Sequence, residues 1–204
     1  MGLSPSQPNV ELFSAECFGG PPELTEIPTP GKHIFCLLAE LFGARSRGGV
    51  TLASADPLAA PVVDTGFLSD ALDAEVLAEA CRFANDIVMR GEGMAGVVKG
   101  SWPPEAGHSE LQTRDEWVRH VRQNATTCYH ASGTCAMGSP SDPLAVVDPN
   151  LCVRGVSGLR VADCSIIPLL GCCHTQMPAY GIGEKAADLI KATWSHGDAT
   201  LAKL

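Results

Sequence analysis

Positive charge is scarce in this chain, because 14 Lys and Arg residues stand against 23 Asp and Glu residues and leave a net charge of −9. An acidic surface repels a phosphate backbone, so we expect no nucleic-acid partner. No apolar run approaches the ~20 residues that a membrane-spanning helix needs, and we expect no membrane span. Residues 1–6 lack the basic and apolar segments of a secretory signal, which indicates an intracellular protein.

Cysteine is plentiful, but the spacing that indicates a zinc or redox motif is missing. None of the nine cysteines belongs to a C-x-x-C pair. Without a secretory signal, free thiols in a reducing compartment are the expected state. A zinc site is conceivable from a group of thiols and imidazoles, namely Cys128, His130, Cys135, Cys172 and His174. These residues lack the usual ligand spacing, so we predict no metal site.

The composition indicates a folded chain that is rich in turns. Hydrophobic residues make up 45% and charged residues 18% of the sequence, a balance that excludes disorder as the dominant state. Glycine and proline number 21 and 15, and both are frequent in residues 1–32, which we expect to be irregular. Short apolar segments bounded by turn residues predict strands at 10–13, 34–41, 50–53 and 62–64, and a strand pair at 151–154 and 159–162.

Three helices are predicted by different local signals. Apolar residues from Val76 to Ile87 recur on one face of a helix that ends at Gly91. Residues 113–116 read T-R-D-E, a capping box that satisfies free N–H groups at the start of a second helix. Pro178 suits the first turn of a third helix that runs past Ile190.

Two of the six histidines lie in segments rich in small residues and turns. His130 and His174 can therefore face a cavity, although a single histidine is more often structural. A neutral imidazole can accept the hydroxyl proton when hydride leaves an alcohol carbon, and a second imidazole can orient the same hydroxyl. The helix that begins after His174 would add positive potential from its free N–H groups.

Several motifs in register give this chemistry a family context. Residues 129–138 read YHASGTCAMG and precede DP at 142–143 and VDP at 147–149. Residues 158–163 read GLRVAD, and His174 is followed by GEKAADLI at 183–190. In order and spacing these motifs resemble the glucose–methanol–choline (GMC) family of flavin oxidoreductases. The segment 45–57 resembles a strand of that family's substrate domain, so the resemblance covers roughly residues 35–194.

The resemblance implies an α+β fold in two parts. Residues 1–142 would form the substrate-domain-like region, in which helices pack on a mixed sheet. Residues 143–204 would form the C-terminal segment of an incomplete FAD-binding domain and supply its last strand and helix.

The resemblance also implies roles for individual residues. His130 falls where the family has its catalytic histidine near flavin N5, and His174 where it has a second histidine or an asparagine. The implied reaction is hydride transfer from a CH–OH group of a small alcohol to FAD, with His130 as acid/base. Five further residues fall on the flavin side. Asp163 would bind a ribityl hydroxyl or backbone N–H groups, and the others would lie near the cofactor: Cys164, Thr175, Gln176 and Met177.

One part of the family pattern is missing, and alternatives follow from it. No glycine-rich segment follows a predicted strand and opens a helix, so the unit that grips the ADP moiety is absent; the glycines at 91–96 follow a helix instead. The chain would then associate with a chain that supplies the dinucleotide-binding half, or with itself. The alternatives are a truncated non-catalytic protein, a partner module for a full-length relative, and lyase-type or light-driven flavin chemistry.

The final Ala202-Lys203-Leu204 differs by one residue from the peroxisomal targeting signal Ser-Lys-Leu.

Overall fold

The computed structural model describes residues 6–15, 31, 33–94 and 96–195. The chain divides into two compact units, Met1–Cys128 and Tyr129–Leu204, which are described separately below. Most of the predicted irregular region 1–32 lies outside the described residues, as does the C-terminal Ala202-Lys203-Leu204. The predicted boundary at 142/143 separates a substrate-domain-like region from a cofactor-binding segment, whereas the boundary between the compact units separates parts by their internal contacts. The predicted boundary therefore stays a prediction.

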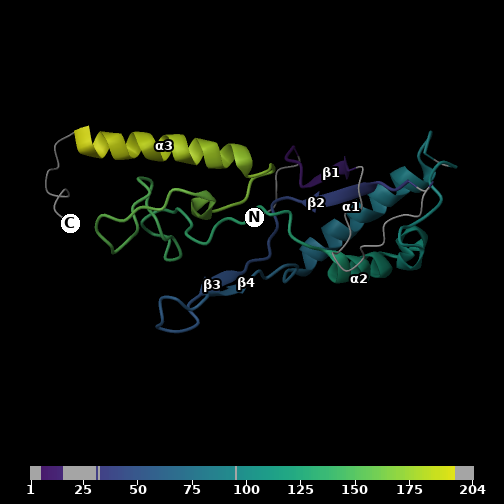
Figure 1. Ribbon diagram of the computed structural model, residues 1–204, viewed down its shortest axis with the longest axis horizontal. Coiled ribbons are helices and arrows are strands. Elements are labelled where there is room, and N and C mark those ends of the chain that lie inside the picture. The colour runs from purple at the N-terminus through teal and green to yellow at the C-terminus, as the bar shows by residue number, and fades with distance from the viewer. Residues whose placement is uncertain (1–5, 16–30, 32, 95, 196–204) are drawn as a thin grey trace. The chain divides into compact units, whose positions relative to one another are not determined.

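A helix pair and a small sheet build the first unit (Figure 1). Strands β1 (Val10–Ala15) and β2 (Cys36–Leu41) pair antiparallel, with Val10 opposite Leu41 and Ala15 opposite Cys36. Helix α1 (Ala71–Arg90) packs on β2, and helix α2 (Arg114–Asn124) packs on α1. The core between the helices consists of Ala78, Trp117 and Val121.

Helix α1 ends before Gly91 as predicted, and the predicted apolar face is only partly buried. Asp70 caps its first turn by accepting the N–H of Leu72, and Gly91 follows its last residue. The buried positions are mostly alanines, whereas Phe83 is 57% exposed. On the predicted apolar face Ala80 and Ala84 are buried, but Ile87 is 40% exposed. The buried residue that packs with Trp117 is Ala78, because a small side chain lets α2 approach α1 closely.

A buried carboxylate fixes the loop that precedes α1. Asp73 is 4% exposed and accepts the backbone N–H groups of Arg45 and Ser46 at 2.9 and 2.7 Å. The Ser46 hydroxyl also donates to it at 2.5 Å. Burial opposes the ionisation of Asp73, but these donors outweigh burial and lower its pKa from the ordinary value of 3.8. The ionised side chain therefore ties residues 45–46 to the helix.

The second sheet of this unit is a hairpin with both faces exposed. Strands β3 (Gly49–Thr51) and β4 (Val62–Asp64) pair antiparallel. At its base, Gly66 has a φ of +59°, and a Cβ there would lie 2.1 Å from the Arg47 carbonyl oxygen, so only glycine fits. Both sheets are two-stranded and antiparallel, so the expected mixed sheet was wrong for the described residues. The β1–β2 sheet and the β3–β4 hairpin stay separate, since the backbone hydrogen bonds of β3 and β4 within a sheet run only between these two strands.

Irregular backbone and one long helix form the second unit. Helix α3 (Gln176–Ser195) covers a core of Val147, Leu151, Ile166 and Ala186. The described residues of this unit hold isolated bridges, such as Cys152 with Arg160, and a short 3-10 helix, η3 (Cys164–Ile166). The predicted hairpin of 151–154 with 159–162 is confirmed as an antiparallel pairing, in which the Val153 N–H donates to the Leu159 carbonyl at 2.9 Å and the Val161 N–H donates to the Leu151 carbonyl at 3.1 Å. Neither described segment forms a regular strand, so the expected C-terminal strand is reduced to this bridge, whereas the predicted helix was confirmed.

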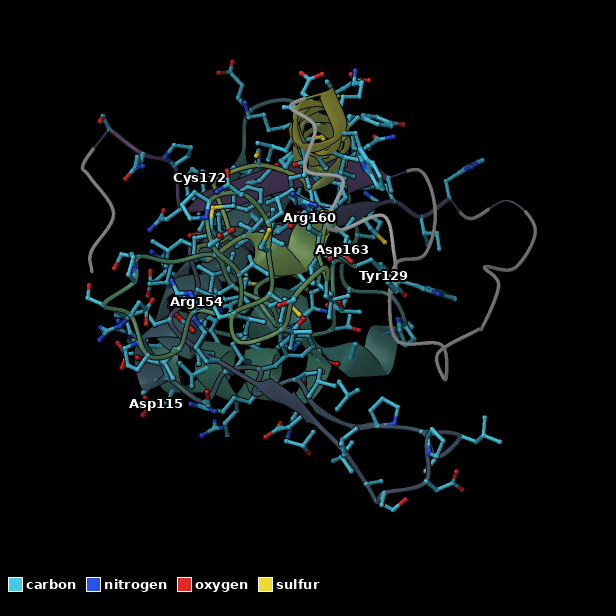
Figure 2. All side chains as sticks on the ribbon, turned by 90° about the vertical axis from the view of Figure 1, so that its left-hand side faces the viewer. Asp115, Tyr129, Arg154, Arg160, Asp163 and Cys172 are labelled. Atoms are coloured by element: carbon cyan, nitrogen blue, oxygen red, sulfur yellow. The ribbon has the colours of Figure 1, made fainter. Side chains whose placement is uncertain are left out.

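Two arginine side chains link the loops of this unit. The Arg154 guanidinium donates to the carbonyl oxygens of Gly138, Ser139 and Asp142 at 2.7 to 3.0 Å. Arg160 donates to the Asn150 carbonyl and, at 3.1 Å, to the Thr193 hydroxyl of α3; both arginines are labelled in Figure 2. Each planar guanidinium donates to several oxygen atoms and so satisfies them without strand pairing.

No described helix has the length and apolarity that crossing a membrane requires.

Candidate active site

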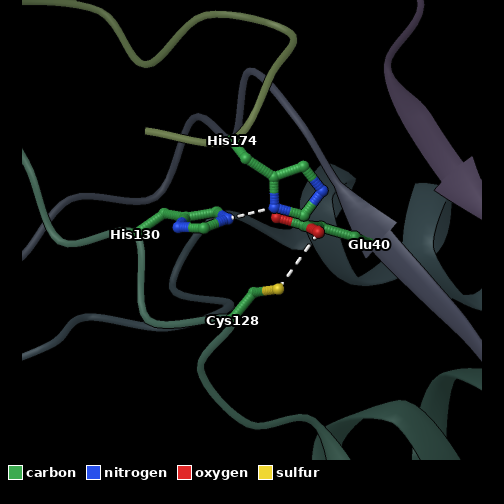
Figure 3. A group of neighbouring side chains, drawn as sticks. All are labelled: Glu40, Cys128, His130 and His174. Carbon is green, nitrogen blue, oxygen red and sulfur yellow. Dashed lines mark hydrogen bonds between the residues drawn. The ribbon is translucent and has the colours of Figure 1, made fainter. Parts of the chain in front are cut away.

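The structure brings the two predicted catalytic imidazoles into direct contact. Nε2 of His130 lies 2.5 Å from Nδ1 of His174, although 44 residues separate them in sequence (Figure 3). The ring centroids are 4.6 Å apart and the ring planes are nearly perpendicular, at 89°. A hydrogen bond at this distance requires that one nitrogen carries the proton and the other accepts it. The pair therefore behaves as one proton-sharing unit.

Backbone hydrogen bonds to η3 position the segment after His130. Cys135 N–H donates to the Ser165 carbonyl, and Met137 N–H donates to the Ile166 carbonyl, each at 2.9 Å. Gly133 has a φ of +84°, and a Cβ there would lie 3.2 Å from the Ile167 carbonyl oxygen. A larger residue would strain this turn and displace His130.

The start of α3 positions His174 and Thr175. The Thr175 carbonyl accepts the Ala179 N–H at 2.9 Å and so closes the first turn of the helix. The Cys164 thiol lies 3.8 Å from the same carbonyl oxygen. The hydroxyl of Thr175 lies 3.2 Å from Nδ1 of His130. Both ring nitrogens of His130 thus contact the two residues that directly precede α3.

The remaining predicted cofactor residues lie close to this start of the helix. Asp163 accepts the Ser165 N–H at 2.8 Å; the Ser165 hydroxyl and this N–H lower the pKa of Asp163. Gln176 lies 3.5 Å from the Tyr180 hydroxyl, and Met177 is 73% exposed. Their roles toward a cofactor stay predictions. Asp163, Cys164, Thr175, Gln176 and Met177 all belong to the second unit.

Sequence reasoning did not find an apolar hollow of about 490 Å³ beneath α3. Its lining combines one face of α3 with the loops before the helix, and only Thr175 and Lys185 add strongly polar groups to it. The exposed Trp194 and Met177 extend the apolar character along α3. The pattern of Ile182, Ala186 and Leu189 signalled one buried face, but the depth of the hollow depends on loops from elsewhere in the sequence: Met137, Leu151, Ile166, Leu169 and Leu170.

The thiol of Cys128 belongs to the first unit and is held in its protonated form. It donates to the Glu40 carboxylate at 3.0 Å, a bond also drawn in Figure 3. Burial and the nearby Glu40 raise the pKa of Cys128 to about 11. A thiol is a metal ligand or nucleophile only as the thiolate, so this residue is poorly suited to either role.

A second histidine pair, in the first unit, is packed rather than hydrogen-bonded ring to ring. The rings of His108 and His120 are 5.6 Å apart and tilted by 42°, and His120 also meets the buried Trp117 edge to face. Burial, joined for His108 by repulsion from His120, lowers the pKa of both imidazoles. The packing of these rings on one another and on Trp117 indicates a structural role.

The polar groups of the second unit are chemically compatible with the flavin that the resemblance implies. The paired imidazoles supply a proton acceptor and a donor, and the free N–H groups at the start of α3 favour negative charge. The described residues contain no glycine-rich turn from a strand into a helix, because the glycines from Gly91 follow the end of α1. A dinucleotide would therefore lack its phosphate cradle here.

Comparison with known proteins decides the family. A family model described as GMC oxidoreductase matches residues 44–183. The chain belongs to the GMC oxidoreductase family. The motif resemblance is thereby confirmed, and relatives in this family are flavin dehydrogenases and oxidases.

Individual GMC relatives are substantially longer than this chain. It is 41% identical over 147 residues to an oxygen-dependent choline dehydrogenase of Rhizobium rhizogenes, covering 72% of this chain and 26% of that protein. It is 34% identical over 205 residues to the glucose dehydrogenase [FAD, quinone] of Drosophila pseudoobscura pseudoobscura, covering 93% and 31%. A formate oxidase variant (R554K) of Aspergillus oryzae RIB40, studied for FAD modification, matches with a TM-score of 0.78 and 36% identity, covering 93% and 32%. The chain thus spans about a quarter to a third of these relatives.

Proposed function

We propose that this chain carries the acid–base part of the active site of an FAD-dependent oxidoreductase that acts on the CH–OH group of a small alcohol. The observation that supports the proposal most is the direct contact between Nε2 of His130 and Nδ1 of His174. Removal of hydride from an alcohol carbon also requires removal of the hydroxyl proton, and a neutral imidazole is suited to accept it.

Each residue of the pair has a distinct task in this proposal. His130 accepts the hydroxyl proton at Nε2, and His174 orients the hydroxyl oxygen through Nδ1. FAD, when bound, supplies the hydride acceptor at its N5 atom. Asp163, Cys164, Gln176 and Met177 would lie on the cofactor side, with residues 1–142 on the substrate side and 143–204 on the cofactor side.

The short contact between the rings implies a movement on substrate binding. An oxygen that hydrogen-bonds to both nitrogens holds them about 4.5 Å apart, since each N···O distance is about 2.8 Å. The observed separation is 2.5 Å, so the rings must move apart by about 2 Å. The substrate hydroxyl would replace the direct hydrogen bond, which keeps both imidazoles satisfied before and after binding.

Cofactor binding would need more protein than these residues provide. The described residues lack a glycine-rich phosphate cradle, and these relatives are about three times as long as this chain. We therefore propose that a segment supplying the dinucleotide-binding half packs against the apolar hollow beneath α3, or that this face self-associates. The same lack of a cradle favours the second candidate, a non-catalytic partner module.

The experiment that tests the function compares two histidine variants. The full chain is combined with the dinucleotide-binding part of a GMC relative, FAD is added, and reduction of the flavin by an alcohol is followed without oxygen. His130→Ala should slow flavin reduction by about 10²- to 10⁴-fold, the usual contribution of a general base. His33→Ala, at an exposed position, is the matched control and should leave the rate unchanged. Equal rates in the two variants would refute the assignment, and an assembly that binds FAD but never reduces it would favour the non-catalytic module.

A further inference from the structure

The two ring nitrogens of His130 have different partners. Nε2 meets His174 at 2.5 Å, and Nδ1 meets the hydroxyl of Thr175 at 3.2 Å. Among the described residues this is the one hydrogen bond of the Thr175 side chain. A threonine at the start of a helix often caps free N–H groups, but here its hydroxyl is turned to an imidazole instead.

The backbone of Thr175 is held firmly, so its hydroxyl has a fixed origin. Its carbonyl accepts the Ala179 N–H at 2.9 Å and lies 3.8 Å from the Cys164 thiol. The branched Cβ leaves the side chain few rotamers. The hydroxyl oxygen is therefore suited to hold one orientation of the His130 ring.

The partner of one ring nitrogen decides which nitrogen carries the proton. When Thr175 accepts a proton from Nδ1–H, Nε2 keeps its lone pair and can act as a base. When Thr175 donates to Nδ1 instead, Nε2 must carry the proton and donate to His174, and it cannot accept the proton of an alcohol. Only the first arrangement agrees with the proposed function.

We propose that Thr175 is a positioning residue that holds His130 in the tautomer with the proton on Nδ1, leaving Nε2 as the proton acceptor toward His174. This inference rests on the proposed function and deepens it. It gives Thr175 a role through His130 in place of the expected direct role toward the cofactor. Thr175 itself touches no reacting atom in this assignment.

The test reads the proton position directly in the full chain, without cofactor. Nitrogen NMR of the labelled imidazoles distinguishes a protonated from an unprotonated ring nitrogen. In the wild-type chain the Nδ1 of His130 should be protonated and Nε2 unprotonated. Thr175→Val keeps the shape but removes the hydroxyl, and it should shift the tautomer ratio about fivefold toward Nε2–H, the equilibrium ratio set by one neutral hydrogen bond. Thr175→Ser keeps the hydroxyl and should restore the wild-type ratio.

Two results would overturn the assignment. One is a wild-type His130 with its proton on Nε2, and the other is an unchanged tautomer ratio in Thr175→Val. The amide resonances of α3 report whether each variant keeps the fold of the second unit, since Thr175 directly precedes this helix. Failure of the alcohol oxidation would leave the tautomer measurement intact, so the two proposals can fail separately.

Discussion

Each unit of this chain holds a pair of histidines, and the pairs use the same side chain in opposite ways. In the first unit, the His108 ring packs on His120, which in turn packs on the buried Trp117, and burial lowers the pKa of both histidines. In the second unit, His130 shares a hydrogen bond with His174, on backbone held by irregular loops. A packed imidazole is held neutral and contributes to the core, whereas a hydrogen-bonded imidazole can exchange a proton. The difference lies in the partner of each ring.

The largest expected effect is confined to the helix pair of the first unit. Trp117→Ala should cost about 3–5 kcal/mol in the free energy of unfolding, the usual loss for a buried aromatic side chain. Trp117→Phe should cost much less, because it keeps most of the ring and removes an indole N–H that has no partner among the described residues. Hydrogen exchange should rise in α1 and α2 and stay unchanged in α3. Equal loss of amide protection in both units would show that the two units do not unfold separately.

The buried carboxylate of the first unit should give the next largest effect. Asp73→Asn should cost about 2–3 kcal/mol, because it replaces an acceptor with a donor opposite the N–H groups of Arg45 and Ser46. The folded-state pKa is lowered from 3.8, so the ionised carboxylate stabilises the fold above that pH, and the gain is lost as pH falls through the lowered value. Urea unfolding between pH 3 and pH 7 measures this. A variant whose stability falls in acid as steeply as that of the wild type would contradict the assignment.

The loops of the second unit should depend on guanidinium geometry. Arg154→Met keeps the apolar stem but removes three bonds to carbonyl oxygens, and we expect a loss of about 2 kcal/mol. Arg154→Lys keeps the charge but not the planar fork, and it should recover only part of the loss. Amide exchange at residues 138–147 should report the change while α1 stays protected. Full recovery by lysine would show that charge alone holds the loop.

The smallest effect concerns the packed histidines. Because the folded-state pKa of His108 and His120 is lowered from 6.5, the unfolded chain binds more protons, and stability should fall as pH drops below about 6.5. A double His108→Gln, His120→Gln variant should lose this pH dependence. Between pH 5 and pH 7 the lost change in the free energy of unfolding should be under about 1 kcal/mol. The same slope in both proteins would assign the effect to other groups.

The elements that could be predicted from the sequence are those set by local interactions. The Thr113–Glu116 capping box and the helices 71–90 and 176–195 depend on neighbours within a few residues. The buried state of Asp73 could not be predicted, since its partners Arg45 and Ser46 lie 28 and 27 residues away. The burial of Ala78 in place of Phe83 likewise follows from the position of α2.

The candidate site shows the same division. Motif spacing identified His130 and His174 as a pair, but it carried no information on the 2.5 Å contact or on the hydroxyl of Thr175 beside Nδ1. The hollow beneath α3 is built from loops whose approach depends on the Arg154 and Arg160 guanidinium groups, which no local pattern encodes. Long-range hydrogen bonds thus define what the motifs left open.

The most direct test of the central claim asks whether His130 and His174 act as one unit. Flavin reduction by an alcohol is measured for His130→Ala, His174→Ala and the double variant, each combined with the dinucleotide-binding part of a GMC relative. If the two imidazoles act together on the same hydroxyl group, the double variant should be no slower than His130→Ala alone, because residues that act together give non-additive losses. Losses that multiply in the double variant would contradict the account.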